Sequence, residues 1–192
     1  SAVSAGALLD VARRSIQAAN EDAKSQRLLA TTIKNTTFAR QDDIDAIEKN
    51  LQGLQYSAAV ADDELRPALA SLLRVTKDST KAQELLGVAL DISASTGRDL
   101  QTVSLSLGRA YQGNIGALRR LGLAVSDGTV KNKNFQAAMD EIIPVVEGSA
   151  KAAASGADGG WKKLGIAVGD LSEILGTELN AQLSGAVGAL GK

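Results

Sequence analysis

The 192-residue chain contains neither cysteine nor histidine. The absence of cysteine excludes disulfide bonds and thiol nucleophiles, and the absence of histidine removes the commonest general base. A structural zinc site of the usual kind also needs one of these two residue types. We therefore predict that the chain is not an enzyme, and we assign no catalytic residue, no cofactor and no metal ligand.

Aromatic residues are scarce as well, at 3% of the chain, although 44% of the residues are hydrophobic. Such a core must consist of Ala, Leu, Ile and Val, which favours close helix packing. The 21 basic and 22 acidic residues nearly cancel, so we expect no specific nucleic-acid partner. The sequence also lacks an uninterrupted apolar run of about 20 residues that could span a bilayer, and it does not begin like a signal peptide.

Short helices separated by glycine are expected in the middle of the chain. A first helix begins near Thr80, which has the capping-box spacing to Gln83, and ends at Gly97. The next helix begins at Asp99, a favoured N-cap residue, and ends at Gly113. Turns this short predict that the two helices pack on one another.

A third helix of this series follows directly. Asn114 is expected to cap it and Gly122 to end it, while Leu118 and Leu121 lie on one face. We therefore regard residues 79–122 as the part of the chain around which the rest is organised.

The first 40 residues are predicted to form one long helix with a coiled-coil-like heptad pattern. Its seam is rich in alanine and contains one polar residue, Gln26, at 3,4 spacing: Leu9, Ala12, Ile16, Ala19, Ala23, Gln26, Ala30 and Ile33. Alanine buries little surface, so this helix needs a partner, which is either the rest of the protein or further copies of the chain.

Residues 41–155 are predicted to form a compact helical domain. Acidic residues at 42, 43 and 45 and again at 62–64 are typical of first helical turns, where they complement the helix dipole. Within residues 123–133, the pair Asp127 and Gly128 favours a two-residue turn and predicts a small β-hairpin. The expected fold is otherwise all-α.

Residues 156–192 are predicted to comprise a glycine-rich hinge and a C-terminal amphipathic helix. Gly165 and Gly169 have a spacing that permits close approach of a neighbouring helix. The apolar stripe of this helix begins at Trp161 and comprises Trp161, Leu164, Val168, Leu171, Leu175, Leu179, Leu183, Val187 and Leu190.

Two functional alternatives follow from local patterns. Residues 100–121, with Arg119 and Arg120 in the second helix, imitate a DNA-binding helix-turn-helix. The stripe that begins at Trp161 could instead lie on a membrane surface. Arginines near a helix end are more simply partners of the helix dipole.

Residues 91–103 and 107–122 resemble the tail tape measure proteins of long-tailed bacteriophages. Gly113 and Asn114, followed by Leu118, Leu121 and Gly122, carry the most specific part of this resemblance. The likeness extends to residues 62–69 and to the helix that begins at Trp161. Members of this family are several times longer, so we expect the chain to be a segment of a longer protein from a phage or prophage.

The resemblance implies a structural protein of the virion tail. Tape measure proteins assemble in the bacterial host cytoplasm, set the length of the tail tube and fill its lumen until the viral genome is ejected. The resemblance therefore implies self-association as a helical bundle, contacts with tail tube and tail tip proteins and with tail assembly chaperones, and transient membrane contact. It supplies no catalytic residue.

Overall fold

The computed structural model describes the backbone of residues 5–190 and the side chains of residue 6 and of residues 9–182. The fold is all-α, with a long N-terminal helix and a long C-terminal helix beside a bundle of shorter ones, and the described backbone contains no strand. The helices are α1 Ala5–Thr37, α2 Gln41–Ala58, α3 Asp62–Thr76, α4 Ser79–Thr96, α5 Leu100–Tyr111, α6 Gly116–Arg119, α7 Asp127–Lys131, α8 Phe135–Val146, α9 Ser149–Ser155 and α10 Ala157–Leu190.

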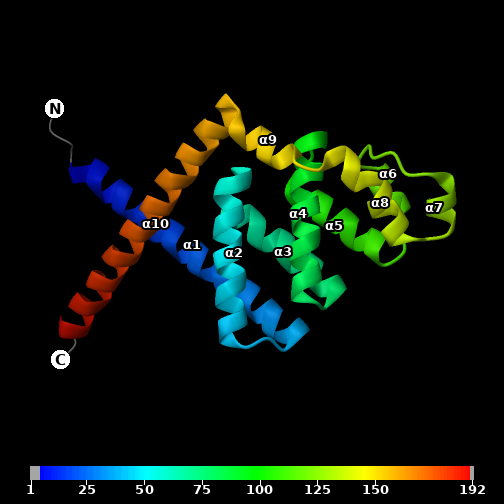
Figure 1. The fold of residues 1–192 in the computed structure, drawn as a ribbon. Helices are drawn as coiled ribbons and strands as arrows, with labels where there is room; N and C mark the ends of the chain where they lie inside the picture. Colours follow the sequence, from blue (N-terminus) through cyan, green and yellow to red (C-terminus); the bar gives the residue numbers. More distant parts are fainter. Residues whose placement is uncertain (1–4, 191–192) are drawn as a thin grey trace.

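The elongated molecule has three zones along its length (Figure 1). Helices α1 and α10 cross at one end, α2 to α5 occupy the middle, and α6 to α8 form the opposite end. Helix α3 packs against α1, α4 and α5, and α9 packs against α4 and α2. The acidic first turns predicted for α2 and α3 are both present, at residues 42 and 43 and at residues 62–64.

The core is aliphatic, as the shortage of aromatic residues predicts. It runs from the last turns of α1, through Leu29 and Ile33, to α8. The largest fully buried side chains are all leucine or isoleucine: Leu29, Ile33, Leu51, Leu65, Leu69, Leu72, Leu73, Leu86, Ile92, Leu107, Ile115 and Leu118. Because Leu29 and Ile33 belong to this core, the second half of α1 is part of the central bundle.

The predicted β-hairpin within residues 123–133 is wrong. Residues 127–131 form the short helix α7, and the Ser126 side chain caps it by accepting a hydrogen bond from the Thr129 amide. A two-residue hairpin turn forms only where the flanking residues can pair as strands. Here a serine in extended backbone conformation instead provides a helix N-cap immediately before Asp127.

The junction between α9 and α10 consists of a single residue, Gly156. The glycines that follow it belong to the first turn of α10, so no linker separates α10 from α9. Gly159 is buried, and a Cβ at this position would collide with the carbonyl oxygens of Ala153 and Ala154. Only glycine lets α10 begin this close to the end of α9.

Candidate functional site

Arg66 of α3 is the one charged side chain in the described core, with 3% of the residue exposed. Its Nη1 donates to Asp22 of α1 at 2.5 Å and pairs with Asp62 of α3 at 2.8 Å. Its Nε donates to Glu48 of α2 at 3.2 Å. One guanidinium group thus joins three helices, and a buried cation is tolerated only when it is paired in this way.

Local sequence explains part of this arrangement. Asp62 lies in the first turn of α3, where a carboxylate complements the helix dipole, and one helical turn before Arg66. Arg66 itself follows Leu65, which is fully buried, so the arginine enters the core with the apolar face of α3. Asp22 and Glu48 reach the same point from helices that pack beside α3.

Helix α10 adds further carboxylates to this group. Oxygen atoms of Asp22, Asp62 and Glu173 all lie within 4.8 Å of one another. Asp170, on the same helix as Glu173, accepts hydrogen bonds from Gln55 Nε2 at 3.0 Å and from the Tyr56 hydroxyl at 2.7 Å. We call Asp22, Glu48, Asp62, Arg66 and Glu173 the acidic cluster.

The acidic cluster favours proton uptake. Burial, followed by the negative charges of Asp22, Asp62 and Asp170, raises the pKa of Glu173 to about 7. Burial also raises the pKa of Asp22 and of Glu48, because desolvation outweighs the attraction of Arg66. The attraction of one shared guanidinium group therefore does not offset the burial of these two carboxylates.

The members of the acidic cluster other than Glu48 line an open groove of about 450 Å³ bordered by α1, α2, α3 and α10. The groove has no lysine, and its only arginine is Arg66. The carboxylates of Asp22, Asp62 and Glu173 offer oxygen ligands of the kind that Mg²⁺ or Ca²⁺ prefers. Arg66 already contacts two of them and competes with any cation at that position.

Most of the predicted helix ends are found where the sequence placed them. Gly97, with φ of +68°, ends α4, and the Asp99 side chain caps α5 by accepting from the Thr102 amide at 2.8 Å. Gly113 and Gly122 have φ of +94° and +92°, which glycine adopts without strain. Leu118 and Leu121 are buried.

Two of the predicted caps are wrong. The N-cap of α4 is Asp78, whose side chain accepts from the Lys81 amide at 3.0 Å, and Thr80 lies inside the first turn. The Asn114 side chain does not cap α6; its backbone carbonyl accepts from the Ala117 amide at 3.1 Å. Helix α6 is too short to need the full set of partners that a longer helix end requires.

Residues 100–121, whose sequence imitates a helix-turn-helix, do not form a recognition helix. The segment expected to enter a groove contains only α6, of four residues. Arg119 is exposed, but its guanidinium is already bonded within the chain, to the Val125 carbonyl and to Asp127 at 2.7 Å. A recognition helix needs several exposed side chains along two or more turns.

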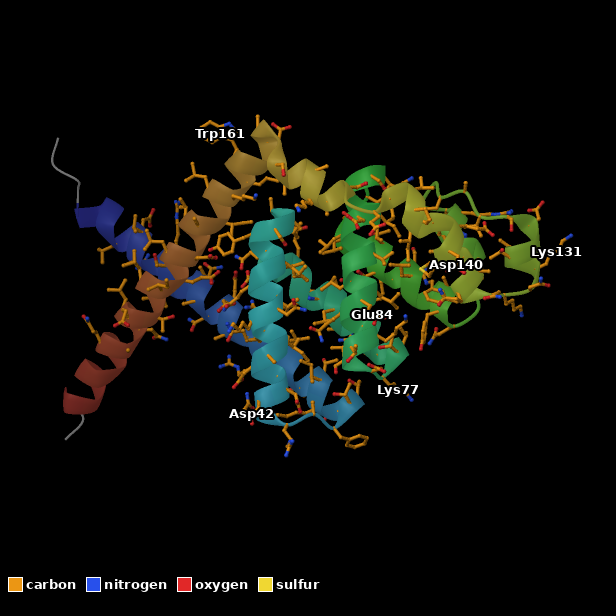
Figure 2. The ribbon with its side chains drawn as sticks, in the orientation of Figure 1. Asp42, Lys77, Glu84, Lys131, Asp140 and Trp161 are labelled. Carbon is orange, nitrogen blue, oxygen red and sulfur yellow. The ribbon has the colours of Figure 1, made fainter. Side chains whose placement is uncertain are left out.

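Helix α10 turns its apolar stripe away from the rest of the chain. The exposed fractions are 73% for Trp161, 53% for Leu164, 61% for Val168, 56% for Leu171 and 48% for Leu175. These residues repeat at 3,4 spacing, which is the heptad pattern of a coiled-coil seam. Figure 2 shows Trp161 near the start of α10, projecting away from the bundle. The side chains of Leu183, Val187 and Leu190, which continue the predicted stripe, lie outside the described part of the chain.

The closest approach of α1 to α10 is not at Gly165 and Gly169, the pair whose spacing permits a neighbouring helix. A Cβ added at either glycine would meet nothing within 4 Å. Gly176 instead lies against the Ser15 backbone, and the Ser15 and Ser172 hydroxyls share a hydrogen bond of 3.1 Å beside it.

No protein-family model matches the chain, and comparisons with curated proteins and with solved structures found no match either. The resemblance to tape measure proteins rests on the sequence motifs given above and stays a prediction.

Within the described residues, none of the helices is both long enough and apolar enough to cross a bilayer.

Proposed function

We propose that the chain is a structural segment of a tape measure protein from a long-tailed phage or prophage, and that it self-associates through α10. The observation that carries the proposal is the exposed heptad stripe from Trp161 to Leu175. An apolar stripe of this length is costly in water, and pairing with an equivalent helix would bury it.

The role fits the remaining features of the fold. The core is aliphatic and helical, and the buried arginine has its donors directed at carboxylates that tie α1, α2 and α3 together. This arrangement supports an assembly component without catalysis. Its partners in the virion tail are other copies of the chain, tail tube and tail tip proteins and, during assembly in the host cytoplasm, tail assembly chaperones.

Self-association can be tested with two matched variants. Leu171 of α10 and Leu28 of α1 are both exposed leucines, at 56% and 60%. Sedimentation velocity at increasing concentration should show oligomers of the unmodified chain, and Leu171→Glu should reduce them at least tenfold, because the substitution places a charge in the seam. Leu28→Glu should leave association unchanged. A monomeric unmodified chain, or equal effects of the two substitutions, would contradict this part of the proposal.

The tape measure role itself predicts an effect on tail length. An α-helix rises 1.5 Å per residue, so deletion of all 192 residues from the encoding gene should shorten an extended tape by about 290 Å. A segment that keeps its compact fold in the tail should shorten it by much less. Electron microscopy of purified virions measures the difference. Tails of unchanged length and number after the deletion would overturn the role.

The same stripe favours one competing function, a helix lying on a membrane surface. Trp161 is followed by Lys162 and Lys163, and an indole ring beside lysines is typical of helices at the lipid interface. Co-sedimentation with vesicles of phosphatidylcholine and phosphatidylglycerol separates the two functions. Tight binding of a monomer that Leu171→Glu abolishes would favour the membrane function over self-association.

A further inference from the structure

Helix α10 has few apolar contacts with the rest of the molecule. Among its described side chains, Ile166 is the only large apolar one that is buried. Its long contact with α1 includes Gly176 and Ser172 against Ser15, and it contacts α2 through Asp170 with Gln55 and Tyr56. The position of α10 therefore depends partly on polar groups, and some of these groups are carboxylates that can ionise.

The charged groups that face Glu173 are mostly acidic. Helix α1 contributes Asp22, α2 contributes the Tyr56 phenol, and α3 contributes Asp62 and Arg66, which also pairs with Glu48 of α2. On α10 itself, Asp170 and Glu178 border the same groove.

The sole cation among these groups already pairs with three other carboxylates. Arg66 pairs with Asp22, Glu48 and Asp62, so an ionised Glu173 adds a further carboxylate beside Asp22 and Asp62 without adding a counter-charge. Like charges within 4.8 Å of one another repel strongly where water is partly excluded.

We propose that Glu173, together with Asp22 and Asp62, forms a proton-operated latch that holds α10 against α1, α2 and α3. When the cluster carries a proton, Glu173 can share it with a neighbouring carboxylate and α10 stays docked. When the cluster is fully ionised, repulsion drives α10 away from the bundle, with Gly156 as the pivot. This inference does not depend on a role in phage tails.

The direction of the pH effect follows from linkage. The pKa of Glu173 is raised to about 7 in the docked state, whereas a solvated glutamate has the ordinary value near 4.5. The docked state therefore binds more protons between these values. Docking is strongest below about pH 4.5, weakens as the pH rises to about 7, and stays weak above it.

The absence of native cysteine allows a direct test, because two spin labels can be placed without competing sites. Thr31→Cys on α1 and Asn180→Cys on α10 are both exposed positions outside the acidic cluster. Double electron–electron resonance should give one docked distance at about pH 5. At about pH 8 a longer distance should appear. The population of the undocked state should be about tenfold higher than at acid pH, a modest increase because solvent screens the half-exposed Glu173.

Two substitutions in the labelled chain complete the test. Glu173→Gln should keep α10 docked at both pH values, because the neutral amide cannot ionise. Asp158→Asn removes a carboxylate from the first turn of the same helix, away from the acidic cluster, and should leave the transition unchanged. Constant far-ultraviolet circular dichroism would show that the helices stay folded. A distance distribution that is the same at both pH values, or a transition that persists in Glu173→Gln, would overturn the latch.

Discussion

Gly176 of α10 lies so close to the Ser15 backbone of α1 that no other side chain fits between the two helices. A Cβ on Gly176 would overlap the Ser15 carbonyl group, which is backbone and cannot rotate away. Gly176→Ala should therefore separate the helices at this crossing and lower the free energy of unfolding by about 1–3 kcal/mol, as overpacking does elsewhere. Urea unfolding followed by circular dichroism measures the change.

Gly169→Ala is the control for Gly176→Ala. Gly169 lies in the same helix with open space around its Cα, so alanine meets nothing there. This substitution should raise the stability by about 0.5–1 kcal/mol through helix propensity alone. Equal effects at the two glycines would show that the crossing does not depend on Gly176.

Among the charged residues, we predict that substitution of Arg66 lowers the free energy of unfolding the most. Arg66→Met leaves Asp22, Glu48 and Asp62 without their shared cation, and loss of one partner of a buried pair costs about 3–5 kcal/mol. Urea unfolding at neutral pH should show this loss. The loss should shrink on acidification, because protonation of the carboxylates removes their mutual repulsion. Arg74→Met, at an exposed position of the same helix, should change stability by less than about 0.5 kcal/mol.

The capping residues of α4 can be distinguished by two alanine substitutions. Asp78→Ala removes the acceptor of the Lys81 amide and should cost about 1 kcal/mol. Thr80→Ala lies within the helix and should cost less than about 0.5 kcal/mol. Thermal unfolding of the two variants decides between them, and a larger loss for Thr80→Ala would contradict the cap seen in the structure.

The Asp99 cap of α5 makes stability rise with pH, whereas the raised pKa of Glu173 makes the docking of α10 weaken as the pH rises. Hydrogen bonds from Thr102 hold the pKa of Asp99 below its ordinary value. The stability that this cap supplies is therefore present at neutral pH and is lost as the pH falls through the pKa of the folded state. The difference between the unmodified chain and Asp99→Ala should be about 1 kcal/mol near neutrality and should shrink as acidification protonates Asp99.

Glu141 of α8 is predicted to hold the segment that precedes α7. Its carboxylate accepts from the Ser126 amide at 2.7 Å and from the hydroxyls of Ser126 and Thr129, which keep its pKa below the ordinary value. Glu141→Gln should increase amide hydrogen exchange in residues 123–131. Asp140→Asn changes the adjacent residue, whose side chain bonds only Gln136 in the same helix, and should leave that exchange unchanged.

Local signals account for much of the fold. The positions of Gly97, Asp99, Gly113 and Gly122 could be predicted because a helix end is determined by a few consecutive residues. The error at residues 123–133 also has a local cause, since Asp127 and Gly128 are common both in turns and after an N-cap serine. The extended conformation of Ser126 decides between these outcomes, and that conformation depends partly on its bonds to Glu141.

The acidic cluster could not be predicted in the same way. Only the pair Asp62 and Arg66 lies within one helical turn, and that spacing is common on exposed helix faces. Asp22, Glu48 and Glu173 come from three other helices, and their proximity depends on how those helices pack. For the same reason Gly176 could not be distinguished from Gly165 and Gly169, because the sequence does not show where α1 crosses α10.

Because no linker separates α9 from α10 at Gly156, a small rotation of α10 at this junction moves its far end by a large distance. Its 34 residues extend about 50 Å, so a rotation of about 10° at the contact between Gly159 and α9 would displace the far tip by about 9 Å. A methyl group added at residue 159 would tilt α10 at its start, and the resulting displacement would increase along the helix toward its C-terminal end. The fit of Gly159 against α9 therefore helps to set the direction of α10.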